Sequence, residues 1–253
     1  AALPLIIGIL TSIYGGIAAM VILPFTIEQM TLMAIFLLIA HNMIQEGVIQ
    51  AKSGIHPLKA TLFRLAAAVI TVIIVGQFLD TRSAVPMTSA SPVSSHQGPF
   101  IEMLQNWGLA TLLLSAKIFV IIMALLTLLE VLKELGWIHT FVNWLAPFLV
   151  VLGLDRKTGI LWLTAVVFGL AYGAAVIVEE AGRGDLSGEE LERLHLSIGI
   201  NHSMVEDPIL FMALGLSAFW LWVPRLVIAV VAVHLLRLWH WSRQRVSVGA
   251  VQQ

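Results

Sequence analysis

The chain has 253 residues, of which 59% are hydrophobic and only 11% charged, and its mean hydropathy is +0.95. Soluble domains carry about 25% charged residues, so this composition excludes an ordinary soluble domain. The net charge of −1 offers no argument for binding nucleic acid, and the absence of cysteine excludes disulfides and thiolate metal sites. Because the chain starts at Ala1 without a methionine or a basic leader, we expect that upstream residues are missing or were removed.

Apolar runs in chain order predict about eight transmembrane helices, because several approach or exceed the roughly 20 residues that cross about 30 Å of hydrocarbon. We therefore expect an all-α integral membrane protein with a single membrane domain over residues 1–253, embedded in the lipid bilayer. The predicted helices cover residues 3–25, 30–49, 58–78, 109–132, 137–154, 158–178, 191–214 and 216–238, with an exposed polar loop at 80–99 and a short interfacial helix at 100–107.

Two similar motifs place ionisable groups in the middle of apolar runs, at residues 40–47 and 201–208. Intramembrane ionisable groups cost several kcal/mol each unless they are paired or hydrated, so they are functional candidates. The polar residues are His41, Asn42 and Glu46 in the first motif and His202, Ser203, Glu206 and Asp207 in the second.

The two motifs belong to a longer internal repeat. His41 matches His202 and Arg64 matches Arg225 at the same offset of 161 residues, and Tyr14 matches Tyr172 at an offset of 158. The first three predicted helices therefore recur as the last three. This pattern predicts one repeat at about residues 1–79, connecting helices at about 100–154 and a second repeat at about 158–241.

The orientation of the repeats depends on residues 137–154, which contain Asn143 and Pro147 and either span the membrane or form a re-entrant hairpin. If they span, nine Lys and Arg residues fall on one side against four; if they re-enter, the count is seven to six. Because cytoplasmic loops carry the Lys and Arg excess, we favour eight spans, inverted repeats and cytoplasmic termini. The nine are Lys52, Lys59, Arg64, Lys133, Arg183, Arg193, Arg237, Arg243 and Arg245, and the four are Arg82, Arg156, Lys157 and Arg225.

The second motif combines a possible ligand set with a helix breaker. On an unbroken helix His202 and Glu206 share a face, whereas Asp207 points about 100° away from Glu206. Pro208 removes an amide donor, so we expect the helix to open there, with Gly47 as the permissive counterpart in the first motif. In inverted repeats such discontinuous helices meet near the midplane, where secondary transporters bind their substrates.

Imidazole and carboxylate groups together suit zinc, iron or manganese better than calcium. The same groups could instead carry protons, hydrogen-bond a polar organic solute, or merely satisfy one another across the repeat interface. No cofactor is expected beyond a possible divalent metal ion, with His41, Glu46, His202, Glu206 and Asp207 as its candidate ligands. Supporting roles in the site are predicted for Tyr14, Tyr172, Glu179, Glu180, Arg64 and Arg225, although an arginine placed like Arg64 more often snorkels to the headgroups.

The residues 199–207 (GINHSMVED), preceded by 168–175 (FGLAYGAA) and 178–180 (VEE), resemble the bacterial "nucleoside recognition" or Gate-domain membrane proteins. Relatives of that group include the pore part of the ferrous-iron transporter B family and the spore maturation A and B proteins. The resemblance covers about residues 1–240 and implies transport or gating by a homodimer in the bacterial inner membrane. The phosphate-binding loop of that iron transporter's GTPase domain is absent from this sequence.

These observations predict a transporter or permease that moves a small polar solute or a divalent metal ion through a midplane site of histidines and acids. Two alternatives remain: a membrane scaffold or assembly subunit without transport activity, and an intramembrane metalloenzyme. The sequence lacks His-Glu-x-x-His and Gly-x-Ser-x-Gly motifs, so we do not expect an enzyme.

Overall fold

The computed structural model describes residues 1–79, 100–184 and 186–251 and forms only helices over these residues. The predicted polar loop at 80–99 therefore lies outside the described residues. The helices are α1 (Ala2–Leu10), α2 (Ile13–Ile22), α3 (Ile27–Ala40), α4 (Met43–Lys52), α5 (Pro57–Gly76), α6 (Phe100–Glu134), α7 (Trp137–Val151), α8 (Arg156–Arg183), α9 (Gly188–Asn201), α10 (Glu206–Met212) and α11 (Ala218–Val251).

Four segments of the described chain are long and apolar enough to cross a membrane. The all-α membrane architecture predicted from the composition is therefore supported, whereas eight spans are not shown. The four segments are Ile27–Lys52, Pro57–Gly76, Leu104–Ile121 and Ala218–Arg243.

The first predicted helix, residues 3–25, is broken into α1 and α2, so the prediction of one spanning helix was wrong. With 9 and 10 residues, each piece is about half the length that a span requires. Ser12 causes the break, because its side chain caps α2 by accepting the Gly15 amide at 3.4 Å. The small residues Gly8 and Gly16 let both pieces pack on Leu37 of α3, since a Cβ at either position would lie under 3.0 Å from that side chain.

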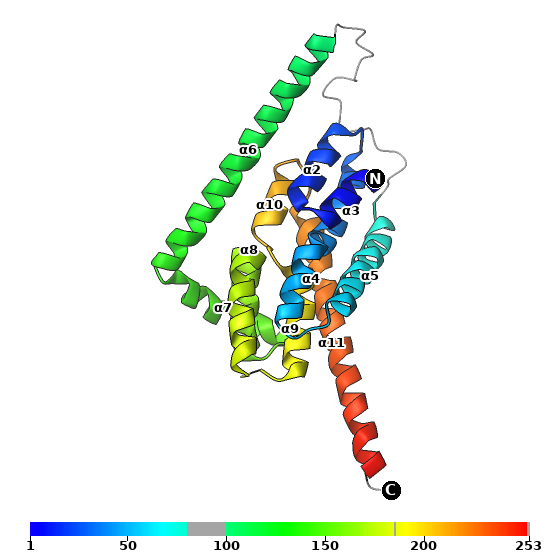
Figure 1. The fold of residues 1–253 in the computed structure, drawn as a ribbon, viewed down its shortest axis with the longest axis vertical. Helices are drawn as coiled ribbons and strands as arrows, with labels where there is room; N and C mark the ends of the chain where they lie inside the picture. The colour runs from blue at the N-terminus through cyan, green and yellow to red at the C-terminus, as the bar shows by residue number, and fades with distance from the viewer. Residues whose placement is uncertain (80–99, 185, 252–253) are drawn as a thin grey trace.

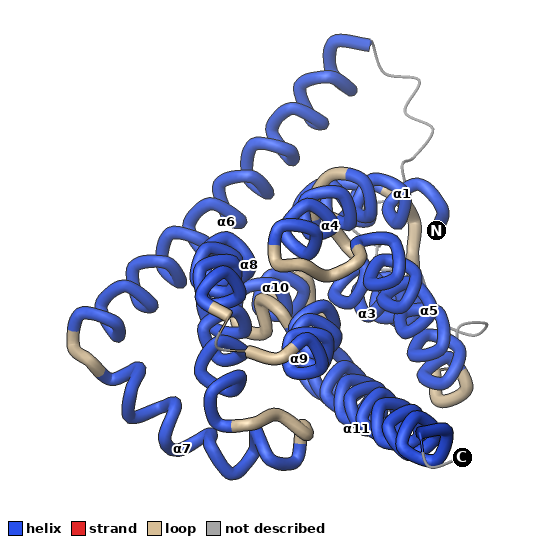
Figure 2. Tube along the Cα trace, turned by 60° about the horizontal axis from the view of Figure 1, so that its bottom comes forward, coloured by secondary structure: helices blue, strands red, loops and turns tan. Residues whose placement is uncertain are grey.

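The centre of the molecule consists of two helix pairs, α3 with α5 and α9 with α11, which also pack against each other. Figures 1 and 2 show these helices side by side, with α4 and α10 continuing the paths of α3 and α9 after a break. The interface between the pairs buries Ile39, Ala68, Ile200 and Ala229 completely. These four residues are two pairs at the repeat offset of 161, so matching positions of the two halves meet in the core.

Helix α6 runs along one side of this centre and stands apart from it over most of its length (Figure 1). It is one continuous helix, which corrects the prediction of a separate interfacial helix at residues 100–107. Lys117, in the apolar part of α6, donates a hydrogen bond to the Ala213 carbonyl at the end of α10 (2.7 Å). The buried backbone at the end of a short helix thus gives this intramembrane lysine a partner.

Candidate functional site

The site is built on two matching helix breaks. Helix α3 ends before His41 and helix α9 ends before His202, and the next residues, Asn42 and Ser203, have left-handed backbone angles (φ 52° and 49°). Left-handed conformations are costly for residues other than glycine, although asparagine tolerates them better than most. The two unusual residues again differ by 161 in number.

Backbone contacts from neighbouring helices hold both breaks open. The Asn42 amide donates to the Gly8 carbonyl of α1 at 3.0 Å, and the amides of Ser203 and Met204 donate to carbonyls of α8 at 3.4 and 3.0 Å. The break therefore lies before Pro208 rather than at it, which corrects our expectation. Pro208 sits in the first turn of α10, where its missing amide hydrogen leaves no bond unmade.

An arginine satisfies the carbonyls that each break exposes. Arg64 donates from Nε to the Ile39 carbonyl (3.0 Å) and from Nη2 to the His41 carbonyl (3.3 Å). In the other half, Arg225 donates from Nε to the Ile200 carbonyl (3.0 Å) and from Nη2 to the His202 carbonyl (2.9 Å). Both side chains are buried, so Arg64 does not snorkel to the headgroups. Gly199 makes room for Arg64, because a Cβ there would lie 2.9 Å from its Cδ.

The two breaks bring the two histidines face to face. The Nε2 atoms of His41 and His202 lie 3.3 Å apart, and both side chains are buried. Each Nδ1 lies within hydrogen-bond distance of the carbonyl four residues earlier, 2.7 Å from Leu37 and 3.2 Å from Ile198. Because a carbonyl oxygen only accepts, each Nδ1 carries the hydrogen and each neutral ring presents a lone pair at Nε2.

Acidic side chains reach across from one half to the histidine of the other. The Glu46 Oε1 lies 3.2 Å from the His202 Nε2, and the Asp207 Oδ2 lies 3.6 Å from the His41 Nε2. Our expectation that His202 would share a face with Glu206 on an unbroken helix was wrong, because the break separates them. The ligand atoms of His41, Glu46 and His202 all lie within 4.8 Å of one another.

The two halves use their acids differently. Glu46 also forms an ion pair with Arg64, through Arg64 Nη1, and both side chains are 2% exposed. The Arg225 Nη1 and the Asp207 Oδ2 are buried without a hydrogen-bond partner, and so is the Glu46 Oε1 that faces His202. The cluster therefore holds two carboxylate oxygens and one guanidinium nitrogen that still have bonding capacity.

Charge in the cluster is almost balanced. The carboxylates of Glu46, Glu206 and Asp207 face the guanidinium groups of Arg64 and Arg225, which leaves one net negative charge when the imidazoles are neutral. In a buried site of low dielectric constant, such an excess favours one added positive charge.

The remaining predicted site residues lie in three different places. Glu206 accepts a hydrogen bond from the Tyr14 hydroxyl of α2, and Asn42 donates to the Gln45 side chain at 2.7 Å. Glu179 and Glu180 do not join the cluster but pair with Arg183, each at 2.7 Å, on a surface-exposed part of α8. The Tyr172 side chain lies outside the described ones.

Sequence reasoning missed Trp222, which donates from Nε1 to the Met204 carbonyl at 2.7 Å and so supports the second break. It also missed Gly199, described above. Neither has an identical residue at the repeat offset, so the pattern that revealed the histidines and arginines gave no signal for them.

The chain is 30% identical over 236 residues to the uncharacterized membrane protein YvoD of Bacillus subtilis (strain 168). The alignment covers 91% of this chain and 74% of that protein. The chain belongs to the same family of membrane proteins as YvoD. No family model and no solved structure matches it. The relationship and the apolar helices together establish a membrane protein, and several of those helices suggest that it is multi-pass.

Proposed function

We propose that this protein is a membrane transporter or permease of the Gate-domain type, and that its substrate is a divalent metal cation bound between the two helix breaks. The observation that carries the proposal is the pair of buried Nε2 lone pairs, 3.3 Å apart, that point at each other. Two lone pairs at this distance repel unless a positive charge lies beside both. The carboxylate oxygens of Glu46 and Asp207 face the same place.

The spacing of the donor atoms suits a transition metal. A zinc ion with bonds of about 2.0–2.1 Å to tetrahedral ligands separates them by about 3.3–3.4 Å. The distances from the His202 Nε2 to the His41 Nε2 (3.3 Å) and to the Glu46 Oε1 (3.2 Å) are close to that separation. The outward Nδ1 groups bonded to carbonyls supply the second shell that metal-bound imidazoles commonly have. Imidazole and carboxylate ligands favour zinc, iron or manganese over calcium.

A proton is the second candidate, because the single net negative charge of the cluster is the charge that one proton balances. Metal and proton would then compete for the same Nε2 atoms. A polar solute is favoured by a different feature, the unpartnered Arg225 Nη1 beside the Asp207 oxygen, which together offer a donor and an acceptor.

The arrangement of the chain in the membrane is part of the proposal. Matching contacts at an offset of 161 residues support two repeats, and the Lys and Arg count supports their inverted orientation, eight crossings and cytoplasmic termini. The family resemblance adds the inner membrane and a homodimer. We do not propose an enzyme, since the carboxylates are occupied by arginine, tyrosine or histidine rather than by an arrangement typical of hydrolysis.

The proposal is tested by metal flux into liposomes that contain the purified protein. We expect uptake of Mn²⁺ by the wild type, loss of uptake in His202→Ala, and normal uptake in His234→Ala. His234 is a suitable control because it bonds to the Val230 carbonyl at 2.9 Å on an exposed part of α11. Equal loss of uptake and of folding in His202→Ala would indicate a structural role, and wild-type protein without any flux would favour a scaffold.

A further inference from the structure

A cavity of about 240 Å³ lies between the α4–α5 turn and the helices α9 and α11. Two buried polar atoms in its lining have no hydrogen-bond partner: the Gln50 Oε1 and the His195 Nε2, on side chains that are 4% and 5% exposed. Buried polar atoms in proteins are almost always bonded, so these two need a ligand or water. Gln50 lies one helical turn beyond Glu46 on α4, so the cavity begins directly below the central cluster.

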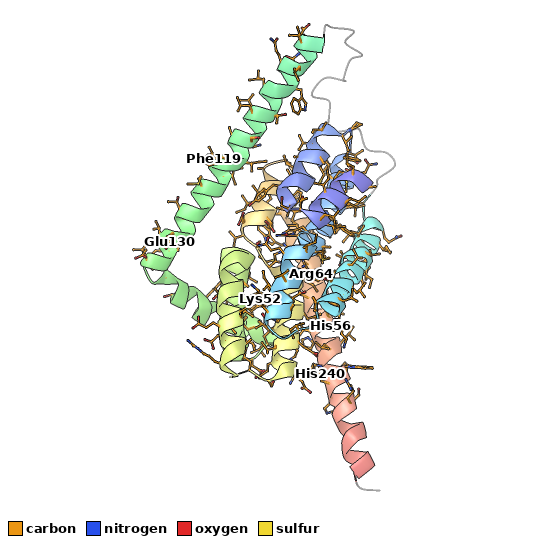
Figure 3. The ribbon with its side chains drawn as sticks, viewed as in Figure 1. Lys52, His56, Arg64, Phe119, Glu130 and His240 are labelled. Carbon is orange, nitrogen blue, oxygen red and sulfur yellow. The ribbon has the colours of Figure 1, made fainter. Side chains whose placement is uncertain are left out.

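Arg64 is the wall that the cavity and the cluster share. Its side chain lines the cavity, and its guanidinium donates to Glu46 and to the His41 carbonyl on the other side. Figure 3 shows Arg64 in the middle of the molecule, with His56 lower down beside the α4–α5 turn. His56 and Lys59 line the cavity as well and are exposed, so its mouth opens at the end of the molecule that carries them.

The matching place in the other half is filled. The positions 161 residues from Gln50, His195 and Ala60 are occupied by Phe211, Ala34 and Leu221, which are completely buried in one apolar cluster. Since the backbones of the two halves share their helix breaks and arginine contacts, the side chains themselves make the difference. The cavity is thus a property of one half, and polar side chains line it where apolar ones would close it.

The chemistry of the lining favours a hydrated cation. The Gln50 oxygen accepts hydrogen bonds, His195 offers a nitrogen lone pair in one tautomer, and Glu192 adds a carboxylate that also bonds to His240 at 2.9 Å. These groups suit the water shell of a divalent ion. Lys59 opposes a cation, but it is exposed at the mouth, where solvent and salt screen its charge.

We propose that this cavity is an outer binding site for the hydrated divalent cation, from which the ion passes Arg64 to reach the site between His41 and His202. The proposal rests on the function proposed above and adds the side of access. The ion enters or leaves at the end of the molecule that carries Lys52 and Lys59, and the corresponding route through the other half is closed by packed apolar side chains. By the Lys and Arg count that end faces the cytoplasm.

The absence of native cysteine makes accessibility the direct test. Ala60→Cys places a thiol in the cavity lining, and Ala34→Cys, on the completely buried counterpart of His195, is the matched control. In vesicles of known orientation we expect a membrane-impermeant cationic thiol reagent to modify Ala60→Cys at least about ten times faster than Ala34→Cys, because thiol reactivity requires exposure. The reaction should occur only from the Lys52 side, and Mn²⁺ should slow it.

Three further results decide the matter. Modification that is faster with an anionic reagent of the same size, that occurs from the opposite side, or that Mn²⁺ does not slow would overturn the proposal. Gln50→Leu in the Ala60→Cys background should keep modification and lose protection by Mn²⁺. Protection should persist in His41→Ala/His202→Ala, which separates the outer site from the central one: central binding in the wild type without protection at Ala60→Cys refutes only the outer site.

Discussion

The half-sites around His41 and His202 share a backbone and differ in one methylene group. Both have a helix break, a left-handed residue after the histidine and an arginine that binds the freed carbonyls. In the first half the acid is Glu46, which pairs with Arg64 while one oxygen faces His202. In the second half the acid is Asp207, which faces His41 at 3.6 Å and makes no hydrogen bond to Arg225.

The difference teaches how a duplicated scaffold gains a direction. The longer glutamate satisfies an arginine and a histidine at once, so the first half is tied together by an ion pair. The shorter aspartate leaves Arg225 Nη1 and its own oxygen unpartnered, so the second half keeps bonding capacity at the same depth. The hollow space beside Arg64 and the packed core on the other side follow the same division.

The largest effect is expected from removing the arginines. Arg64→Met leaves the buried Glu46 carboxylate without its partner, whereas Arg225→Met leaves only carbonyls unsatisfied. Breaking a buried pair costs about 3–5 kcal/mol and a lost hydrogen bond about 1–3 kcal/mol, so Arg64→Met should be the more destabilising by about 2 kcal/mol or more. Unfolding in detergent measures the difference, and Glu46→Gln/Arg64→Met should recover part of the loss. Equal destabilisation by the two arginine variants would refute the asymmetry.

The next effect concerns the length of the acid. Asp207→Glu should reach Arg225 as Glu46 reaches Arg64, and its carboxylate should then turn away from His41. We expect the affinity for Mn²⁺ to fall by about 10-fold or more, as when groups that support metal ligands are changed. Calorimetry measures it, and Glu206→Asp, next in the chain, serves as the control. Unchanged or tighter binding in Asp207→Glu would show that Asp207 has no part in the site.

A smaller effect is expected at Tyr14, whose hydroxyl donates to Glu206. Tyr14→Phe removes one hydrogen bond at a side chain that is 37% exposed, so stability should fall by about 1 kcal/mol. The affinity for Mn²⁺ should stay the same, because Glu206 is not placed against either histidine. Thermal unfolding and calorimetry on the same sample test both halves of this prediction, and a large loss of affinity would assign Glu206 to the central site.

The smallest effect concerns the left-handed residues. Ser203→Gly removes an unfavourable backbone conformation and should stabilise the protein by up to about 1 kcal/mol. Asn42→Gly should gain less, because asparagine tolerates this conformation and the Asn42 side chain bonds to Gln45 at 2.7 Å. Comparing the two unfolding midpoints measures the difference, and the reverse order would mean that Ser203 is held by contacts other than those described.

The sequence predicted the main features of this arrangement because they depend on local or repeated signals. Composition predicted a helical membrane protein, and the shared offset of histidine and arginine pointed to His41, His202, Arg64 and Arg225 together. The position of the break was not predictable, because it depends on backbone carbonyls of α1 and α8 that are distant in the chain. Pro208 was a misleading signal, since a proline in the first turn of a helix removes no bond.

The crossed pairing of acids and histidines was also beyond sequence reasoning. Spacing within one helix relates His202 to Glu206, whereas the observed partner of His202 is Glu46, at 3.2 Å. Only the packing of the two halves brings these atoms together. The break of residues 3–25 at Ser12 has a local cause, a capping serine, and is visible in the sequence once the short helices are known.

The central claim is that His41 and His202 bind one divalent cation between them. The most direct measurement is metal binding by the purified protein, with calorimetry for stoichiometry and X-ray absorption of the zinc-loaded sample for its ligands. We predict one metal ion per chain with two imidazole nitrogens at about 2.0–2.1 Å, and loss of binding in His41→Ala/His202→Ala. A wild-type protein that binds none of zinc, iron or manganese, or binds zinc through oxygen atoms alone, would contradict the claim and favour a proton or an organic solute.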